Sequence, residues 1–253
     1  MMQMDINCDM GEGIGNEELL MPFISSANIA CGMHAGDENE MKRVVALCLK
    51  YNVAIGAHPS FPDKENFGRA AMNLPAEKVQ RLVKEQLNIL DKIVIAAGGR
   101  MHHVKPHGAL YNMAAEDTLL AKAIADAVKD FDSAIIYYGL SGSVMIDEAI
   151  KSGLRTAQEV FADRTYQSDG SLTPRSVPGA LITNADQVIA QVLQMINEQK
   201  VTVANGEKIS IQADTICIHG DGINAVEFAK KIYESLLAAG IAIKKYNYPP
   251  AGI

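Results

Sequence analysis

The sequence has few cysteines, no long apolar run and no cluster of basic residues, and each shortage excludes a class of protein. Its four cysteines, Cys8, Cys31, Cys48 and Cys217, are widely spaced, and none lies in a Cys-x-x-Cys pair. This spacing is typical of reduced, buried thiols and predicts a cytoplasmic protein. The first residues, MMQMDIN, show no basic residue followed by an apolar stretch, so no signal peptide is predicted.

Charge and hydropathy exclude two kinds of partner. The sequence has 23 Lys and Arg against 30 Asp and Glu, a net charge of −7, and no segment is rich in Lys or Arg. A nucleic acid or an anionic membrane is therefore not an expected partner. The longest apolar runs, such as residues 93–97, are far shorter than the ~20 residues that a membrane span needs.

Short apolar runs alternate with segments of helical period along the chain, which predicts a mainly parallel sheet covered by helices. Seven or eight such units within 253 residues favour a single β/α-barrel domain over residues 1–253, with a doubly wound open sheet as the alternative. We expect strands over 6–8, 27–31, 53–57, 103–105, 134–138, 156–160 and 215–218, and a late edge strand over 241–244. We expect helices over 37–51, 76–97, 115–130, 144–152, 185–198 and 225–239, and long connections without helical pattern over 59–75 and 162–184.

Polar residues recur directly after the predicted strands, at the end where barrels and open α/β sheets bind ligands. Asn7, Asp9 and Glu12 accompany the first strand. Residues 5, 7 and 9 share one face of a strand, so this face is polar where a barrel interior is usually aliphatic. Lys105 and His107 follow the fourth strand, and a lysine directed into a barrel mouth is costly unless it meets an anion. This last segment is the strongest candidate for function.

The other strand ends supply further candidates. Four histidines, His34, His58, His107 and His219, each end a different predicted unit, and packing alone does not explain their convergence on one face. Asp37 and Asp221 have a simpler interpretation as helix caps. Glu159 and Asp163 suit either an acid, base or metal ligand, or an ion pair with Arg164. The remaining candidates are Arg69 and Arg175, which can bind a carboxylate or phosphate.

Two chemistries fit these residues. Histidine and carboxylate clusters bind divalent metals that activate water, whereas acid–base catalysis can proceed without a metal while cations hold an anionic substrate. The sequence has no P-loop, no Gly-x-Ser-x-Gly and no Rossmann glycine motif, so an ordinary P-loop enzyme, a serine hydrolase and a dinucleotide-dependent dehydrogenase are not expected.

Taken together, the motifs resemble the lactam-utilization protein B family, the bacterial A subunits of 5-oxoprolinase. They run in order over nearly the whole chain: DINCDMGE (5–12), NIACGMHAGD (28–37), GAHP (56–59), FGR (67–69), KPHGALYN (105–112), EVFADRTY (159–166) and IHGD (218–221). The chain has Ser60-Phe61 where Gly-Tyr is common in the family, and Ala70 where a second arginine is common.

The resemblance implies a seven-stranded β/α barrel of the glycoside hydrolase/deacetylase type. It also implies ATP-dependent hydrolysis of 5-oxoproline to glutamate, together with partner subunits B and C. For that chemistry we assign catalytic roles to Asp9, His58, Lys105 and His107, with His107 or His58 as the base. We assign substrate binding to Asn7, His34, Arg69, Glu159, Arg164, Arg175 and His219, and Mg²⁺ or another divalent metal to Asp9, Glu12 and Asp221. Two alternatives remain open: a metal-dependent deacetylase or amidohydrolase acting on a carbohydrate or cyclic amide, and a non-catalytic lactam-binding component.

Overall fold

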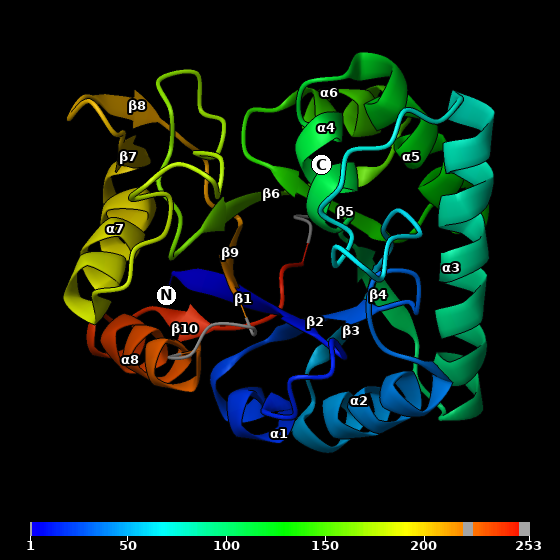
Figure 1. The fold of residues 1–253 in the computed structure, drawn as a ribbon. Coiled ribbons are helices and arrows are strands. Elements are labelled where there is room, and N and C mark those ends of the chain that lie inside the picture. Colours follow the sequence, from blue (N-terminus) through cyan, green and yellow to red (C-terminus); the bar gives the residue numbers. More distant parts are fainter. Residues whose placement is uncertain (1, 220–224, 248–253) are drawn as a thin grey trace, which may run out of the picture.

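Seven parallel strands close into a barrel (Figure 1). The computed structural model describes residues 2–219 and 225–247 of the chain. The last barrel strand, β9, pairs with both β6 and β1, which closes the ring and excludes the open sheet. The predicted seven-stranded β/α barrel is therefore confirmed. Its strands are β1 (Gln3–Met10), β2 (Ser26–Ala30), β3 (Ala54–His58), β4 (Met101–Val104), β5 (Ile136–Leu140), β6 (Arg155–Phe161) and β9 (Thr215–Ile218).

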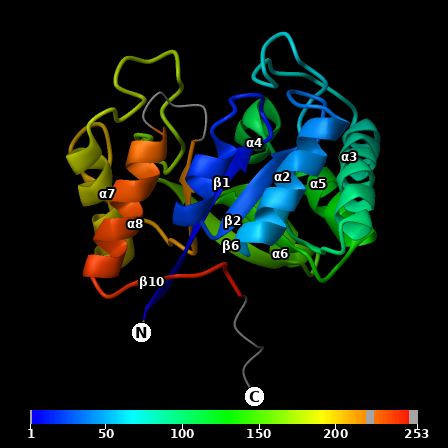
Figure 2. The ribbon, with the colours of Figure 1, turned by 90° about the horizontal axis from the view of Figure 1, so that it is seen from below.

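Helices cover the outside of this barrel, as Figures 1 and 2 show. The six predicted helices form with bounds within three residues of those expected. Asp37 accepts a hydrogen bond from the backbone N–H of Glu40 at 2.9 Å, so its simpler interpretation as a helix cap is confirmed. The helices are α2 (Glu38–Tyr51), α3 (Ala76–Ala96), α5 (Thr118–Phe131), α6 (Val144–Lys151), α7 (Ala185–Glu198) and α8 (Ala225–Ala238). Within residues 2–219 and 225–247, no helix has both the length and the hydropathy of a membrane span.

Several short elements were not predicted, because each is too short to show a hydropathy period. The most important is α4 (Gly108–Ala114), which directly follows Lys105 and His107. Tertiary contacts hold it, since the N–H of Ala109 donates to the carbonyl of Gly68 at 2.9 Å. The others are α1 (Glu17–Leu20), the 3-10 helix η1 (Met21–Phe23), and the hairpin of β7 (Lys200–Thr202) and β8 (Lys208–Ser210). The predicted late strand is β10 (Ala242–Ile243), which pairs in parallel with the start of β1.

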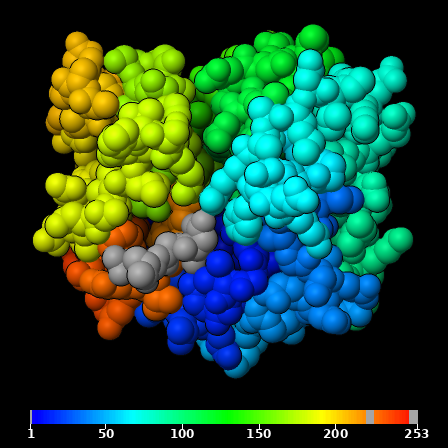
Figure 3. All heavy atoms as spheres, viewed as in Figure 1, coloured from blue at the N-terminus to red at the C-terminus, as the bar shows by residue number. Residues whose placement is uncertain are grey.

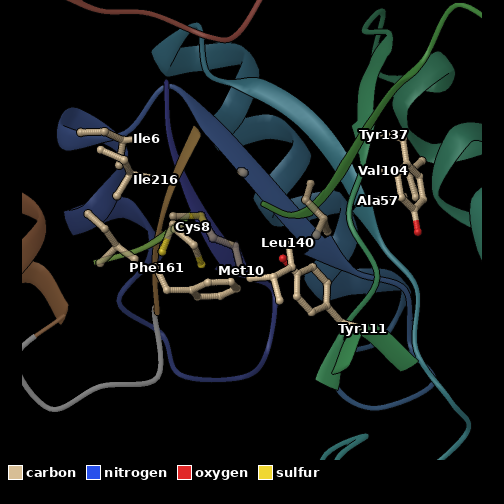
Figure 4. Packing of buried hydrophobic residues seen from close by; sticks show 14 of the residues in the cluster. Ile6, Cys8, Met10, Ala57, Val104, Tyr111, Tyr137, Leu140, Phe161 and Ile216 are labelled. Carbon is tan, nitrogen blue, oxygen red and sulfur yellow. The ribbon is translucent and has the colours of Figure 1, made fainter. Parts of the chain in front are cut away.

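Side chains of β1 alternate between the two faces of the barrel wall. Ile6, Cys8 and Met10 are buried in the apolar cluster between the strands and the helices. Figure 4 shows Ile6 beside Ile216 of β9, its partner in the strand pairing. The intervening residues, including Asp5, face the barrel interior and are also buried. The polar inner face that the sequence predicts for this strand is present.

The carboxylate of Asp5 organises the lower half of the barrel interior. It accepts hydrogen bonds from Ser25 at 2.6 Å, Ser26 at 2.7 Å, Thr215 at 2.6 Å and Tyr138 at 3.0 Å. Burial raises the pKa of Asp5, although these four hydroxyl groups oppose the shift. The four donors come from three strands and from the segment before β2, so this carboxylate ties separate parts of the chain together.

A second polar layer lies above Asp5 and leads to the mouth of the barrel. Asn28 donates to Asn7 at 2.7 Å and to Asp9 at 2.8 Å, and its own side-chain oxygen lies 2.8 Å from Nε2 of His103. Any side chain at Gly56 would collide with the ring of His103, so glycine is required at this position of β3. The interior is therefore a hydrogen-bonded column that positions Asp9 from below.

The apolar layer outside the barrel should carry most of the stability. Leu87 of α3 is completely buried, whereas Leu119 of α5 is 75% exposed. Leu87→Ala should lower the free energy of unfolding by about 2–5 kcal/mol, because it leaves a cavity. Leu119→Ala removes the same atoms from a solvated site and should change it by less than about 0.5 kcal/mol. Urea unfolding of both variants checks this, and equal losses would contradict the assignment of the core.

Candidate active site

A cavity of about 350 Å³ opens at the carboxyl ends of the barrel strands. This is the size of a pocket for a small molecule. Both long connections contribute to its walls: residues 59–75 supply Arg69, and residues 162–184 supply Arg164, Gln167 and Arg175. Figure 3 shows a hollow between the yellow-green surface of the second connection and the cyan and green surfaces opposite. The connections predicted to lack helices therefore enclose the site.

The ammonium group of Lys105 is the centre of the cavity floor. Its Nζ lies 2.8 Å from Oδ1 of Asp9, 2.9 Å from Oε1 of Glu159 and 3.3 Å from Oδ1 of Asn7. Sγ of Cys217 is 3.0 Å away. Lys105 is only 2% exposed, so these contacts replace water around a full positive charge.

Electrostatics keep this pair ionised. Burial by itself would lower the pKa of Lys105, but Asp9, Cys217 and Glu159 raise it well above its ordinary value. Burial would likewise raise the pKa of Asp9, but His58 and Lys105 lower it well below the usual range. A fixed ammonium beside a fixed carboxylate is therefore available at neutral pH, and it is suited to stabilise negative charge on a reacting group.

His58 and His107 form the second part of the floor. Nε2 of His58 and Nδ1 of His107 lie 2.9 Å apart. The other ring nitrogen of each histidine contacts a backbone carbonyl oxygen, that of Lys105 at 2.7 Å and that of Phe67 at 2.9 Å. Burial lowers the pKa of His107 well below its ordinary value, and the nearby His58 and His34 add to the shift. Both rings are held in one orientation by the backbone.

His34 supports these rings from behind. Its ring stacks on that of His107 with centroids 3.8 Å apart. Its Nδ1 contacts Oγ of Ser60 at 2.8 Å and its Nε2 contacts Oε1 of Glu12 at 3.2 Å. Burial lowers the pKa of His34 to about 3, with His58 as the next cause, so the ring is neutral at pH 7. Ser60, one of the departures from the family pattern, therefore helps to orient a buried histidine.

A strained turn closes over this histidine group. Phe67 has φ +56°, a left-handed conformation that is rare for an aromatic residue, and Gly68 follows with φ +67°. A side chain at Gly68 would come within 2.8 Å of His34 and 2.9 Å of His107. The Phe67 ring lies edge-on to both of these imidazoles and contacts the guanidinium of Arg69. Strain of this kind is often found at functional sites.

The opposite wall carries two arginines. Arg164 is 4% exposed, and its Nη2 donates to the carbonyl of Thr173 at 2.6 Å. Its Nε is buried without a hydrogen-bond partner among the described residues. Burial lowers the pKa of Arg164 to about 10, and the neighbouring Arg175 adds to the shift. This pair of cations is suited to hold an anion.

Most of the predicted site residues meet in this cavity. Those that line it are Asp9, Glu12, His58, Arg69, Lys105, His107, Arg164, Arg175 and His219. Asn7, His34 and Glu159 do not line it, which differs from the expected contact with a substrate. Each of the three is buried beneath the cavity surface and contacts a residue that lines the cavity. Asp221 lies outside the described residues.

His219 and Asp163 form a hydrogen-bonded pair that the sequence pattern did not predict. Nδ1 of His219 lies 2.8 Å from Oδ1 of Asp163. The expected partner of Asp163, Arg164, contacts the carbonyl of Thr173 instead, and Glu159 pairs with Lys105. Strand β6 ends at Phe161 and residues 162–163 form a turn, so the position of Arg164 does not follow from alternation along the strand.

Three further residues of the site were missed. Asn28 hydrogen-bonds Asp9, and its position at the start of NIACGMHAGD was a usable signal. Phe161 lies two residues after Glu159 in β6, and its ring is 5.4 Å from Nζ of Lys105. Nothing local indicates Phe67, whose left-handed backbone depends on tertiary contacts.

The described residues contain two groups that can hold a metal ion. Asp9, Glu12, His58 and His107 form the first, and Asp9, Cys217 and His219 form the second. In each group one ligand atom per residue lies within 4.8 Å of the others. The Lys105 ammonium lies 3.0 Å from Sγ of Cys217, a ligand atom of the second group, and would repel a cation there. In the first group it contacts only Oδ1 of Asp9, and Oδ2 of Asp9 lies beside His58.

Comparison with known proteins identifies the family. Residues 4–250 match the profile of the LamB/YcsF family. This chain belongs to the LamB/YcsF family. The match extends across all the barrel strands and both long connections, so the family assignment rests on the whole fold.

Similar proteins match nearly the full chain. The protein named as the A subunit of 5-oxoprolinase in Bordetella pertussis is 53% identical over 245 residues, 95% of this chain and 97% of the relative. The protein of the same name in Shouchella clausii is 53% identical over 248 residues, 96% and 98% of the two chains. The crystal structure of the lactam utilization protein from Thermus thermophilus has a TM-score of 0.91 at 42% identity, over 96% of this chain and 99% of that one.

Removing the buried ammonium should cost far more stability than removing an exposed one. Lys105→Met leaves Asp9 and Glu159 buried without their counterion and should lower the free energy of unfolding by about 3–5 kcal/mol. Lys84→Met breaks an exposed pair with Asp130, with Nζ and Oδ2 3.3 Å apart, and should lower it by less than about 1 kcal/mol. Urea unfolding compares the two, and similarly small losses would show that the Lys105 cluster is not a strong constraint.

Proposed function

We propose that this chain is the A subunit of an ATP-dependent 5-oxoprolinase, which opens 5-oxoproline to glutamate together with partner subunits B and C. The observation that carries the proposal is the 53% identity, over nearly the whole chain, to relatives named as A subunits of 5-oxoprolinase. The polar cavity supports it, because its cations and histidines suit the hydrolysis of a small anionic amide.

A five-membered lactam is an unreactive amide, which explains the need for ATP. Phosphorylation of the amide oxygen turns that oxygen into a leaving group and makes the ring carbon electrophilic. Water then adds to this carbon, and the C–N bond breaks as the ring nitrogen takes up a proton, which leaves an acyl phosphate. A second water hydrolyses the acyl phosphate to the carboxylate and free phosphate. Lys105 and Arg69 are the cations that we assign to the phosphoryl group.

Magnesium, which accompanies ATP, is a poor match to the cavity floor. Asp9 and Glu12 provide the oxygen ligands that Mg²⁺ prefers, but two imidazole nitrogens share the same space. We therefore assign Mg²⁺ to the nucleotide and no protein site to it.

The histidines and arginines complete the proposed roles. His107 or His58, beside Asp9, takes the proton of the attacking water. Arg164 and Arg175 bind the carboxylate of 5-oxoproline, and the unpartnered Nε of Arg164 supports this assignment. Catalysis then occurs between the two walls of the cavity.

The direct test is release of glutamate and ADP from 5-oxoproline and Mg·ATP. The purified chain is assayed alone and then mixed with its B and C subunits. We expect activity only in the mixture, and a fall in kcat of at least about 100-fold for His107→Gln, because a proton-transfer group is lost. His102→Gln, in β4 just before His107 in the chain but outside the cavity, is the matched control and should retain activity.

Two results would refute the proposal. Absence of glutamate release in the complete mixture would remove 5-oxoproline as the substrate. If His107→Gln raised only KM and left kcat unchanged, the chain would be a lactam-binding component and not a catalytic one.

The arginine wall should act mainly in substrate binding. Arg175→Ala removes an exposed cation and should raise KM for 5-oxoproline about tenfold, with kcat within about twofold of wild type. Its KM for ATP should stay unchanged. Steady-state kinetics with each substrate varied in turn separates these effects, and a rise confined to KM for ATP would reassign Arg175 to the nucleotide.

A further inference from the structure

The facing nitrogens of His58 and His107 lack a proton to share when both rings are neutral. Nδ1 of His58 contacts the carbonyl oxygen of Lys105, and Nε2 of His107 contacts that of Phe67. A carbonyl oxygen only accepts, so each of these nitrogens carries the hydrogen of its ring. The other two nitrogens, Nε2 of His58 and Nδ1 of His107, then direct lone pairs toward one another at 2.9 Å.

Two carboxylate oxygens adjoin these lone pairs. Oδ2 of Asp9 lies 3.4 Å from Nε2 of His58, and Oε1 of Glu12 lies 3.5 Å from Nδ1 of His107. The donor atoms of a metal ion bound at 2.0–2.2 Å are separated by about 2.8–3.6 Å in octahedral to tetrahedral geometry. The three observed separations, 2.9, 3.4 and 3.5 Å, fall within this interval.

We propose that Asp9, Glu12, His58 and His107 form a binding site for one divalent transition-metal ion, Zn²⁺ or an ion with similar ligand preferences. Two imidazole nitrogens and two carboxylate oxygens are a donor set typical of Zn²⁺ and unlike that of Mg²⁺. This set shares Asp9 and Glu12 with the site for Mg²⁺ or another divalent metal that the sequence suggested. It has His58 and His107 in place of Asp221, which lies outside the described residues.

The surroundings orient the ligands as a metal site requires. The backbone carbonyls hold both histidine rings in one tautomer, which is the usual arrangement around histidine ligands. Asn28 and Lys105 bind Oδ1 of Asp9 and leave Oδ2 for the ion. The contact of His34 with Oε1 of Glu12 positions that carboxylate. All four ligands line the cavity, so a bound ion keeps access to water.

The metal proposal goes beyond the proposed function and is tested separately from it. An ion at this position would activate the water for ring opening, and His58 and His107 would then act as ligands. Binding of the ion, however, is a property of this chain alone and does not require ATP, 5-oxoproline or the partner subunits.

The experiment is metal titration of the full chain after treatment with a chelator. Calorimetry with Zn²⁺ and visible spectroscopy with Co²⁺ report affinity, stoichiometry and coordination geometry. We expect one ion per chain, and at least tenfold weaker binding for both His58→Gln and His107→Gln. His102→Gln keeps the same number of histidines as these variants and should bind like wild type. Circular dichroism verifies that each variant is folded.

Two results of the titration overturn the proposal: no binding of either metal, or equal binding by wild type, His58→Gln and His107→Gln. A ring ¹⁵N spectrum showing a proton shared by the two histidines in the presence of Zn²⁺ also overturns it. Metal binding without 5-oxoprolinase activity in the complete mixture supports the site and refutes only the proposed function. Full activity of a chain that binds no metal refutes only the site.

Discussion

The buried Lys105 ammonium constrains the rest of the site. An ammonium that leaves water without compensation costs several kcal/mol, so the surrounding strands supply Asp9, Glu159 and the Asn7 amide oxygen within hydrogen-bonding or ion-pairing distance. These partners come from β1 and β6, and Lys105 directly follows β4. The Lys105 charge therefore links the carboxyl ends of β1, β4 and β6. These strand ends are fixed relative to one another before any ligand binds.

The polar column beneath Lys105 follows from the same constraint. Buried carboxylates and amides are stable only when their hydrogen-bonding capacity is satisfied, so Asp9 requires Asn28, and Asn28 requires His103. At the bottom of the barrel, Asp5 and four hydroxyl groups meet the same requirement. Apolar packing is thereby moved to the layer between barrel and helices, where Ile6 and Met10 lie. The interior is available for chemistry because stability is supplied outside it.

The cavity above this column separates two chemical environments. One side has backbone-oriented histidines and carboxylates, and the other has Arg164 and Arg175. A small anionic amide suits this division, because its charged group meets the arginines while its reacting carbon meets the histidines. Membership of the LamB/YcsF family and the proposed 5-oxoprolinase activity agree with such a division, as does a metal ion among the histidines and acids.

The sequence by itself determined the barrel, the long helices and the strand ends that carry the polar residues. These depend on local hydropathy periods and on the rule that parallel strands end at one side of a sheet, and both are visible in the order of residues. The tertiary structure alone decided which residues pair, namely Lys105 with Glu159 and His219 with Asp163. It also decided that Asn7 and His34 are buried below the cavity surface. The formation of α4 and the left-handed backbone conformation of Phe67 likewise depend on tertiary contacts. Pairing across a closed barrel and strain in a loop depend on contacts between distant segments, and no local pattern encodes such contacts.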